Sequence, residues 1–263
     1  MQKIISIIIA TYNSERTLEK CLHSIIDQKD KSIEIIVVDN SSTDKTKDIL
    51  QFFRKDIDHL ISELDDGIYD AWNKGIRIST GKWIMFVGSD DEFRNDCISD
   101  LKKQITIDSN FDYICGKIMF VNNKGHELKQ FGQPFNWKQF RTLMNLAHVS
   151  SLHNRKLFEK YGYYDTTFRI CGDYEFLLRP KDKLKVKFIN KFFANMLIGG
   201  VSYNSFYGLK ETRNAKLKNK VNFKIFIFFD YYFSVFKLIL NKIKLKLSFI
   251  KNNNLNRKFD NSI

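Results

Sequence analysis

Asp90 and Asp91 are neighbouring carboxylates that follow a short apolar run at residues 83–87. Such a run predicts a buried strand, and the Gly88-Ser89 pair after it predicts a turn. Ligands of open α/β sheets bind beyond the carboxyl ends of the strands, so this turn is a candidate site. Two carboxylates there suit Mg²⁺ or Mn²⁺ that holds phosphate oxygens. The alternative is a solvated turn that caps the next helix.

Polar residues also follow three other predicted strands, at positions 11–13, 39 and 65–67. Each alone is ordinary turn chemistry. The carboxyl ends of neighbouring parallel strands lie together, so the four segments predict a cleft. The chain has no G-x-G-x-x-G and no G-x-x-x-x-G-K-[ST] sequence, the motifs that hold phosphate through backbone groups. A nucleotide bound here therefore needs carboxylates and a metal ion.

The elements that carry these residues alternate between strand and helix. Apolar, β-branched runs predict strands, and apolar residues at a 3.6-residue period predict helices. Strands are expected at residues 4–10, 33–38, 57–61 and 83–87, and helices at 18–26, after 42–43 and at 67–79. Repeated strand–helix–strand units imply a parallel sheet with right-handed crossovers.

The regular alternation ends in the second part of the chain. Residues 113–121 and 126–131, separated by Asn-Asn-Lys-Gly, predict a hairpin. Beyond it we expect a strand-like segment at 149–152, helices at 156–161 and 173–179, and a strand at 186–189.

The chain has 263 residues and a formal net charge of +13, most of it near the C-terminus. Residues 207–263 hold 13 basic and three acidic side chains, a net charge of +10, which leaves +3 for residues 1–206. A hydrophobic content of 43% is ample for a core. The four cysteines form no C-x-x-C pair and the N-terminus lacks a signal-peptide pattern, so we expect a cytoplasmic protein with reduced thiols.

Five segments, in order, resemble those of glycosyltransferase family 2, the inverting enzymes of the GT-A fold that use nucleotide sugars. They lie at residues 6–13, 35–44, 65–75, 88–91 and 172–179 and span roughly residues 4–200. The resemblance implies a Rossmann-like α/β fold whose mixed, mainly parallel sheet is flanked by helices. It also implies sugar transfer, with UDP as the expected carrier, to a hydroxyl of a lipid-linked saccharide. The 65–75 and 88–91 segments are similar to the branch that builds bacterial cell-surface polysaccharides.

On the donor side, the resemblance assigns Thr11, Tyr12 and Asn13 to the nucleotide pocket and Asp39 to a hydrogen bond with uracil or ribose. A helix-capping turn is the alternative for Asp39. Asp65 is a further donor-side candidate, and a turn at the start of a helix is its alternative.

Lys74 and His148 complete the residues that the resemblance assigns to substrates. Lys74 would reach the diphosphate, and an ordinary solvated lysine is the alternative. His148 matches a histidine on the acceptor side of relatives, and a structural histidine is the alternative. The sequence does not decide either case.

For the metal, the resemblance assigns Asp90 as the ligand of Mg²⁺ or Mn²⁺ and Asp91 as its neighbour at the donor sugar or the metal. Gly88 stands where the family has the first acid of its Asp-x-Asp motif. One direct protein ligand is then expected, with the diphosphate and water supplying the rest. This departure also admits a protein that binds nucleotide sugars without catalysis.

For the chemistry, the resemblance assigns Asp173 as the general base that takes the proton of the acceptor hydroxyl. The family often has Glu before this Asp, where this chain has Gly172. Capping of the helix that begins here is the alternative role, and the two are compatible.

Residues 207–263 are expected to form a basic, aromatic helical tail, separate from a transferase domain at 1–206. Charged side chains interrupt every apolar run of the tail, so none is long enough to span a bilayer. A basic helix rich in Phe and Leu fits peripheral binding to the anionic inner face of the cell membrane. A helix packed on the domain and a dimer contact are alternatives. Nucleic acid fits less well, because an acidic cleft repels a phosphate backbone.

Overall fold

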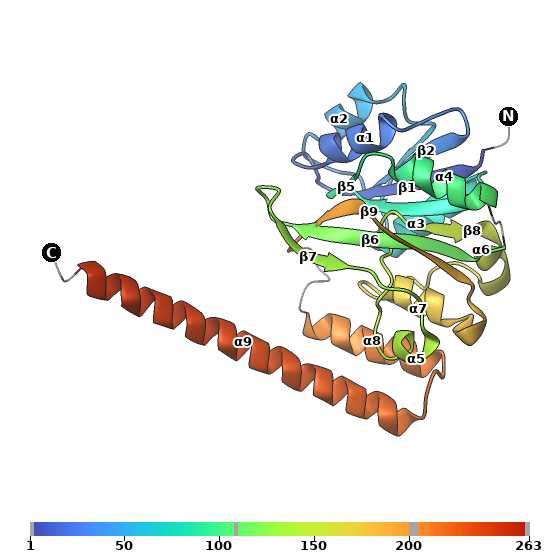
Figure 1. Cartoon of the computed structure of the whole chain (residues 1–263). Coiled ribbons are helices and arrows are strands. Elements are labelled where there is room, and N and C mark those ends of the chain that lie inside the picture. Colours follow the sequence, from blue (N-terminus) through green and yellow to red (C-terminus); the bar gives the residue numbers. More distant parts are fainter. Residues whose placement is uncertain (1–2, 108–109, 200–204, 261–263) are drawn as a thin grey trace.

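A computed structural model describes residues 3–107, 110–199 and 205–260, with side chains up to residue 244 in the last range. The described strands form one mixed sheet in the order β3-β2-β1-β4-β8-β6-β9-β5, and β7 pairs with β6 (Figure 1). The strands are β1 (Ile5–Thr11), β2 (Ile33–Asp39), β3 (His59–Ser62), β4 (Trp83–Gly88), β5 (Asp91–Phe93), β6 (Tyr113–Val121), β7 (Glu127–Phe131), β8 (Leu152–Asn154) and β9 (Val186–Leu197).

Helices cover both faces of the sheet. They are α1 (Leu18–Ile26), α2 (Thr46–Phe52), α3 (Ile68–Ile78), α4 (Cys97–Ile107), α5 (Trp137–Phe140), α6 (Arg155–Tyr161), α7 (Gly172–Leu178), α8 (Phe206–Lys218) and α9 (Lys224–Asp260). Buried side chains of α1, α2 and α4 pack on one face, and those of α3, α6 and α7 pack on the other.

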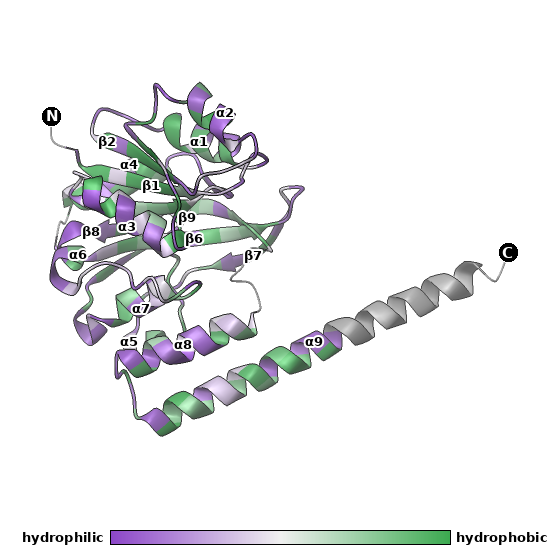
Figure 2. Ribbon diagram, turned by 180° about the vertical axis from the view of Figure 1, so that it is seen from behind, coloured by the Kyte–Doolittle hydropathy of each residue, from purple (hydrophilic) through white to green (hydrophobic). Residues whose placement is uncertain are grey.

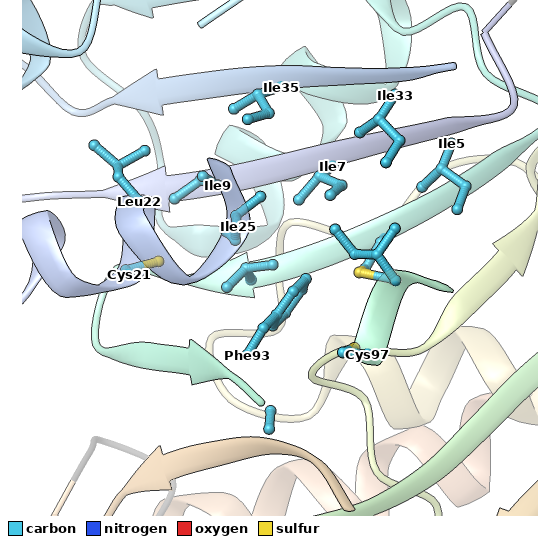
Figure 3. Packing of buried hydrophobic residues seen from close by; sticks show 14 of the residues in the cluster. Ile5, Ile7, Ile9, Cys21, Leu22, Ile25, Ile33, Ile35, Phe93 and Cys97 are labelled. Carbon is cyan, nitrogen blue, oxygen red and sulfur yellow. The ribbon is translucent and has the colours of Figure 1, made fainter. Parts of the chain in front are cut away.

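The first four predicted strands are confirmed, and they form the parallel half of the sheet. β1 pairs in parallel with β2 on one side and β4 on the other, and β3 pairs in parallel with β2. Ile5, Ile7 and Ile9 of β1 face the core under α1 (Figure 3), while Ile8 and Ala10 face the opposite core. Both faces are buried, which explains the unbroken apolar run in the sequence.

The second half of the sheet contains antiparallel pairings. The predicted hairpin is confirmed as β6 and β7. The strand expected at 149–152 is wrong in position, because β8 begins only at Leu152. β9 continues to Leu197, well beyond the predicted end at 189, because its pairing with β6 shifts register after Phe188 and resumes at Phe192. β5 was not predicted, since three residues are too short to show a period.

The start of the predicted tail packs on the domain before it. Glu211 and Ala215 of α8 are buried, and Ala215 and Ile227 belong to the core on the α7 side. α8 and the start of α9 lie beyond α7 on that side (Figures 1 and 2). The division at residues 206 and 207 stays a prediction, but α8 is in contact with the domain. Among the described helices, none is both long and apolar enough to cross a membrane.

Candidate active site

A pocket of about 500 Å³ brings together site residues that are distant in the sequence. Asp90, Asp91, His148 and Asp173 all line it. They come from the turn after β4, the first residue of β5, the segment before β8 and the first turn of α7. A volume of this size is within the usual range for a small-molecule site.

Asp90 and Asp91 differ in environment although they are adjacent. Asp90 is exposed, whereas Asp91 is buried. Asp91 Oδ2 accepts the backbone N–H of Gly88 at 3.1 Å, and Asp91 Oδ1 has no hydrogen-bond partner among the described residues. Burial, and then the charge of Asp90, raise the pKa of Asp91 well above its usual value.

The two carboxylates converge on the position of the missing acid. A Cβ atom added at Gly88 would lie 2.8 Å from Asp90 Oδ1 and 3.0 Å from Asp91 Oδ2. No cluster of three or more His, Cys, Asp or Glu side chains in the described ranges could hold a metal ion. Mg²⁺ needs only one or two carboxylates when phosphates and water complete its shell, so Asp90 and the unpaired oxygen of Asp91 fit such an ion.

Asp173 is half-buried in the first turn of α7. Its Oδ1 accepts the Tyr69 hydroxyl at 3.1 Å, and that hydroxyl also lies 2.7 Å from the carbonyl oxygen of Ile170. The N-cap of α7 is Cys171 and no side chain caps it. Capping is therefore not the role of Asp173, and its carboxylate is available to the pocket.

Tyr69 explains why this chain has glycine before Asp173. A Cβ atom at Gly172 would lie 2.8–2.9 Å from three carbons of the Tyr69 ring, closer than real Cβ contacts. The buried ring of Tyr69 therefore occupies the space that a Glu side chain would need. The sequence analysis gave Tyr69 no role, because its pairing with α7 spans about a hundred residues of chain.

His148 is buried in an aromatic cluster at the pocket wall. Its ring stacks on Trp72 and Phe86 with centroid distances of 4.9 Å and 5.5 Å. Its Nε2 lies 3.1 Å from the Tyr164 hydroxyl. Burial lowers the pKa of His148, against the opposing effect of Asp173. The ring thus has structural partners and also lines the pocket.

The donor-side candidates Thr11 and Asp39 lie opposite each other at the ends of β1 and β2. Asp39 is fully buried, and its carboxylate accepts the hydroxyls of Ser42 and Ser62. Thr11 is buried, and its Oγ1 has no partner among the described residues. Thr11 therefore has a buried, unpaired hydroxyl, whereas the carboxylate of Asp39 is held in a turn, and neither residue lines the pocket.

Tyr12 and Asn13 follow directly in the loop after β1. Tyr12 is exposed. Asn13 has a positive φ of 45°, and its side chain accepts the backbone N–H of Thr43 at 2.9 Å. This bond ties the loop after β1 to the loop after β2.

Asp65 and Lys74 do not line the pocket. Asp65 Oδ1 accepts the backbone N–H of Gly67 at 2.8 Å, and burial raises its pKa. Lys74 Nζ lies 2.9 Å from Glu63 and 3.5 Å from Asp70. Asp65 therefore has a local partner just before the start of α3, and Lys74 has local partners on its surface.

Arg169 is a pocket residue that the sequence analysis missed. Its side chain is exposed and passes close to Gly67, where an added Cβ would lie 2.8 Å from Nη1. Its backbone N–H donates to Glu211 of α8 at 2.7 Å. The position of Arg169, four residues before Asp173, was the available sequence signal for a role in the site. Whether its side chain reaches the pocket depends on the tertiary fold.

Comparisons of the sequence point to one family. The sequence profile described as "Glycosyl transferase family 2" matches residues 6–172. A "PGL/p-HBAD biosynthesis glycosyltransferase" of Mycobacterium bovis (strain BCG / Pasteur 1173P2) is 30% identical over 213 residues, 79% of this chain and 79% of that protein. The "putative teichuronic acid biosynthesis glycosyltransferase TuaG" of Bacillus subtilis (strain 168) is 37% identical over 106 residues, 39% of this chain and 40% of TuaG.

Solved structures share the fold. Residues 1–349 of S. aureus TarS in complex with UDP superimpose with a TM-score of 0.65 and 20% identity, over 83% of this chain and 66% of that one. The mannosyltransferase PcManGT from Pyrobaculum calidifontis, in complex with GDP-Man and Mn²⁺, gives a TM-score of 0.64 and 16% identity, over 88% of this chain and 70% of that one. The likeness confirms the predicted α/β fold.

Proposed function

This chain belongs to glycosyltransferase family 2, and we propose that it transfers a sugar, with inversion, from a nucleotide diphosphate sugar to an acceptor hydroxyl. The observation that carries the proposal is the shared pocket of Asp90, Asp91 and Asp173. The pocket supplies two carboxylates that could hold a metal-bound diphosphate and a third that could accept a proton. UDP is the expected nucleotide.

In the proposed reaction Asp173 is the general base. Its carboxylate takes the proton of the acceptor hydroxyl while that oxygen bonds to the anomeric carbon. The bond from this carbon to the diphosphate breaks on the opposite face, and the diphosphate leaves with the electron pair. The Tyr69 hydroxyl, 3.1 Å from Asp173 Oδ1, orients the carboxylate.

The remaining residues bind the donor. Asp90 and the free oxygen of Asp91 would hold Mg²⁺ or Mn²⁺, which when bound supplies charge to stabilise the leaving diphosphate. The nucleoside would bind at the edge of the sheet where Thr11 and Asp39 end β1 and β2. Tyr12 lies exposed over the same edge of the sheet.

The acceptor is proposed from the relatives. The names of the mycobacterial protein and of TuaG refer to PGL/p-HBAD biosynthesis and to teichuronic acid biosynthesis. We therefore place this enzyme in the synthesis of a cell-surface glycolipid or polysaccharide, with a lipid-linked saccharide as acceptor.

The test of the donor is a panel of UDP-, GDP- and dTDP-sugars with the full chain. Thermal stabilisation by the nucleotide should appear in Mn²⁺ and diminish in EDTA. Release of the nucleoside diphosphate should then rise when acceptor is added. Binding without release in the presence of acceptor would favour a non-catalytic binding protein. No stabilisation by any nucleotide sugar would contradict the proposal.

The tail is proposed to bind the membrane surface through α9. Within the described side chains of α9, residues 224–244, only a narrow stripe is buried, at Ile227 and Leu238. The opposite side carries exposed apolar residues, among them Phe229 at 66% and Phe233 at 59% exposure, and Figure 2 shows the predominance of apolar colour along the described part of α9. At about 100° per residue, Lys237 falls between the buried and exposed sides, where a lysine reaches lipid headgroups.

Vesicle binding by the full chain tests this proposal. Binding should rise when phosphatidylglycerol is added to phosphatidylcholine, and weaken without vanishing in high salt. The double variant Phe229→Gln/Phe233→Gln should bind vesicles at least about tenfold more weakly, because it lacks the two aromatic rings that would insert into the lipid. Phe52→Gln, 78% exposed on α2, is the matched control. Equal binding by the double variant and the control would contradict insertion of α9, and a loss of self-association in the double variant would point to a dimer contact instead.

A further inference from the structure

The pocket has an apolar wall that starts beside its carboxylates. Ile118 and Phe120 of β6 lie on the same face of their strand, two residues apart. Ile118 is the cross-strand partner of Phe131 in β7, and Phe120 is the partner of Met196 in β9. These four side chains, which all line the pocket, form one patch across three adjacent strands.

The patch begins directly beside the candidate metal site. Met196 of β9 is the cross-strand partner of Asp91 in β5, so the two side chains project from the same face of the sheet. Met144 and Val149, from the segment before β8, add further apolar lining. The reacting carboxylates and the apolar wall are therefore parts of one continuous pocket.

The four described side chains of the wall offer no hydrogen-bond partner to a sugar hydroxyl. Between residues 118 and 121 the backbone of β6 pairs with β7 on one side and with β9 on the other, so its polar groups already have partners. The backbone at Met196 is likewise between β6 and β5. Only apolar side chains are then presented to a ligand. A sugar ring placed there would bury hydroxyls without hydrogen bonds to these side chains, which is unfavourable.

We infer that this wall binds an apolar aglycone, an alkyl or aryl group attached close to the acceptor hydroxyl. The inference rests on the proposed function, because it assigns the polar side of the pocket to the donor and Asp173. An apolar group is stabilised by burial against the wall, and the gain increases with each CH₂. The donor would then bind the polar side of the pocket, and the apolar group of the acceptor would bind the apolar wall.

Methionine methyl groups give a direct test in the full chain loaded with UDP. The chain has five methionines; Met144 and Met196 line the pocket. Met119, between Ile118 and Phe120, projects from the other face of β6 and serves as an internal control. The probes are n-octyl, 4-nitrophenyl and methyl β-D-glucopyranoside, the first below its micelle concentration. Met144→Gln and Met196→Gln assign the two signals.

The octyl or nitrophenyl glucoside should shift the ¹³C-methyl signals of Met144 and Met196 and leave Met119 unchanged, while the methyl glucoside shifts neither. A response to only one of the two identifies the aglycone as alkyl or aryl. No shift with either at millimolar concentration would overturn the inference. Equal shifts with the methyl glucoside would also overturn it, since the sugar itself would then occupy the wall. Shifts that appear on raising the protein concentration alone would assign the wall to a second copy of the chain.

Binding strength gives the matched control. Met144→Gln and Met196→Gln should each weaken octyl glucoside binding by about tenfold, because a polar amide replaces the apolar surface. Leu143→Gln changes an exposed neighbour outside the lining and should bind as the unaltered chain does. Thermal stabilisation by UDP is measured in parallel. Loss of UDP binding with intact methionine shifts would refute the proposed donor and not the apolar wall.

Discussion

The carboxylate of Glu211 on α8 accepts the backbone N–H of Cys171 at 2.8 Å, two residues before Asp173. The same carboxylate accepts the N–H groups of Arg169 and Ile170 at 2.7 Å and 2.8 Å. One buried side chain of the predicted tail therefore holds the loop that leads into α7. Through this loop α8 positions both Asp173 and the pocket residue Arg169.

Glu211→Ala should lower the free energy of unfolding by about 2–4 kcal/mol, because three partly buried N–H groups lose a charged acceptor. Glu211→Gln keeps one acceptor oxygen and should lose less. In both variants kcat should fall while the Kd for UDP stays within about twofold, since the donor residues lie on other loops. Urea unfolding, turnover and UDP titration are the measurements. Glu159→Gln, exposed on α6, is the control, and an unchanged kcat in Glu211→Ala would rule out a positioning role.

Asp173→Asn keeps the size of the side chain but cannot accept a proton. Transfer should fall by about 10²–10⁴-fold, the usual effect of a positioned base, with UDP binding unchanged. Steady-state transfer and thermal shift with UDP check the two parts. Asp182→Asn, an exposed change nine residues further along, should have no effect. Turnover near the unaltered rate in Asp173→Asn would place the base elsewhere.

Asp90→Ala should abolish transfer and weaken UDP binding in Mn²⁺, because the exposed ligand of the diphosphate-bound metal is removed. The melting temperature without UDP should not change, since Asp90 lies exposed in the turn after β4. Asp48→Ala, exposed on α2, is the matched control. Equal transfer by the unaltered chain in EDTA and in Mn²⁺ would contradict the metal assignment.

His153 makes stability depend on pH below neutrality. It is fully buried, and neither ring nitrogen has a partner among the described residues. Burial, and then His148, lower its pKa well below the usual value of 6.5. The unfolded chain therefore binds the proton more readily, so stability is present above about pH 6.5 and is lost as pH falls.

Between pH 7.5 and 5.5 this residue alone should cost about 1.4 kcal/mol of unfolding free energy. Urea unfolding at the two pH values measures the loss. His153→Leu, which cannot be protonated, should show a loss smaller by that amount. His59→Leu, with a half-exposed ring on β3, is the comparison. The same pH dependence in His153→Leu as in the unaltered chain would contradict the argument.

The parallel half of the sheet could be predicted from the sequence, together with the edge at which we expect ligands to bind. The apolar runs at β1, β2 and β4 are unbroken because both faces of these strands are buried. Such runs can be recognised in a short stretch of sequence. Parallel strands then bring Thr11, Asp39 and Asp90 to one edge. Five short motifs in order were enough to indicate the family.

The surroundings of those residues depend on contacts between distant segments and could not be predicted from the sequence. The Tyr69 ring against Gly172 and the Glu211 carboxylate against residues 169–171 join segments far apart in the chain. The apolar wall arises because β5, β9, β6 and β7 pair side by side, although β5 and β9 are separated by about ninety residues. The local period of apolar residues predicts which face of its own strand a side chain occupies. The period does not predict which strand pairs beside that one, because strand pairing depends on burial summed over the whole sheet.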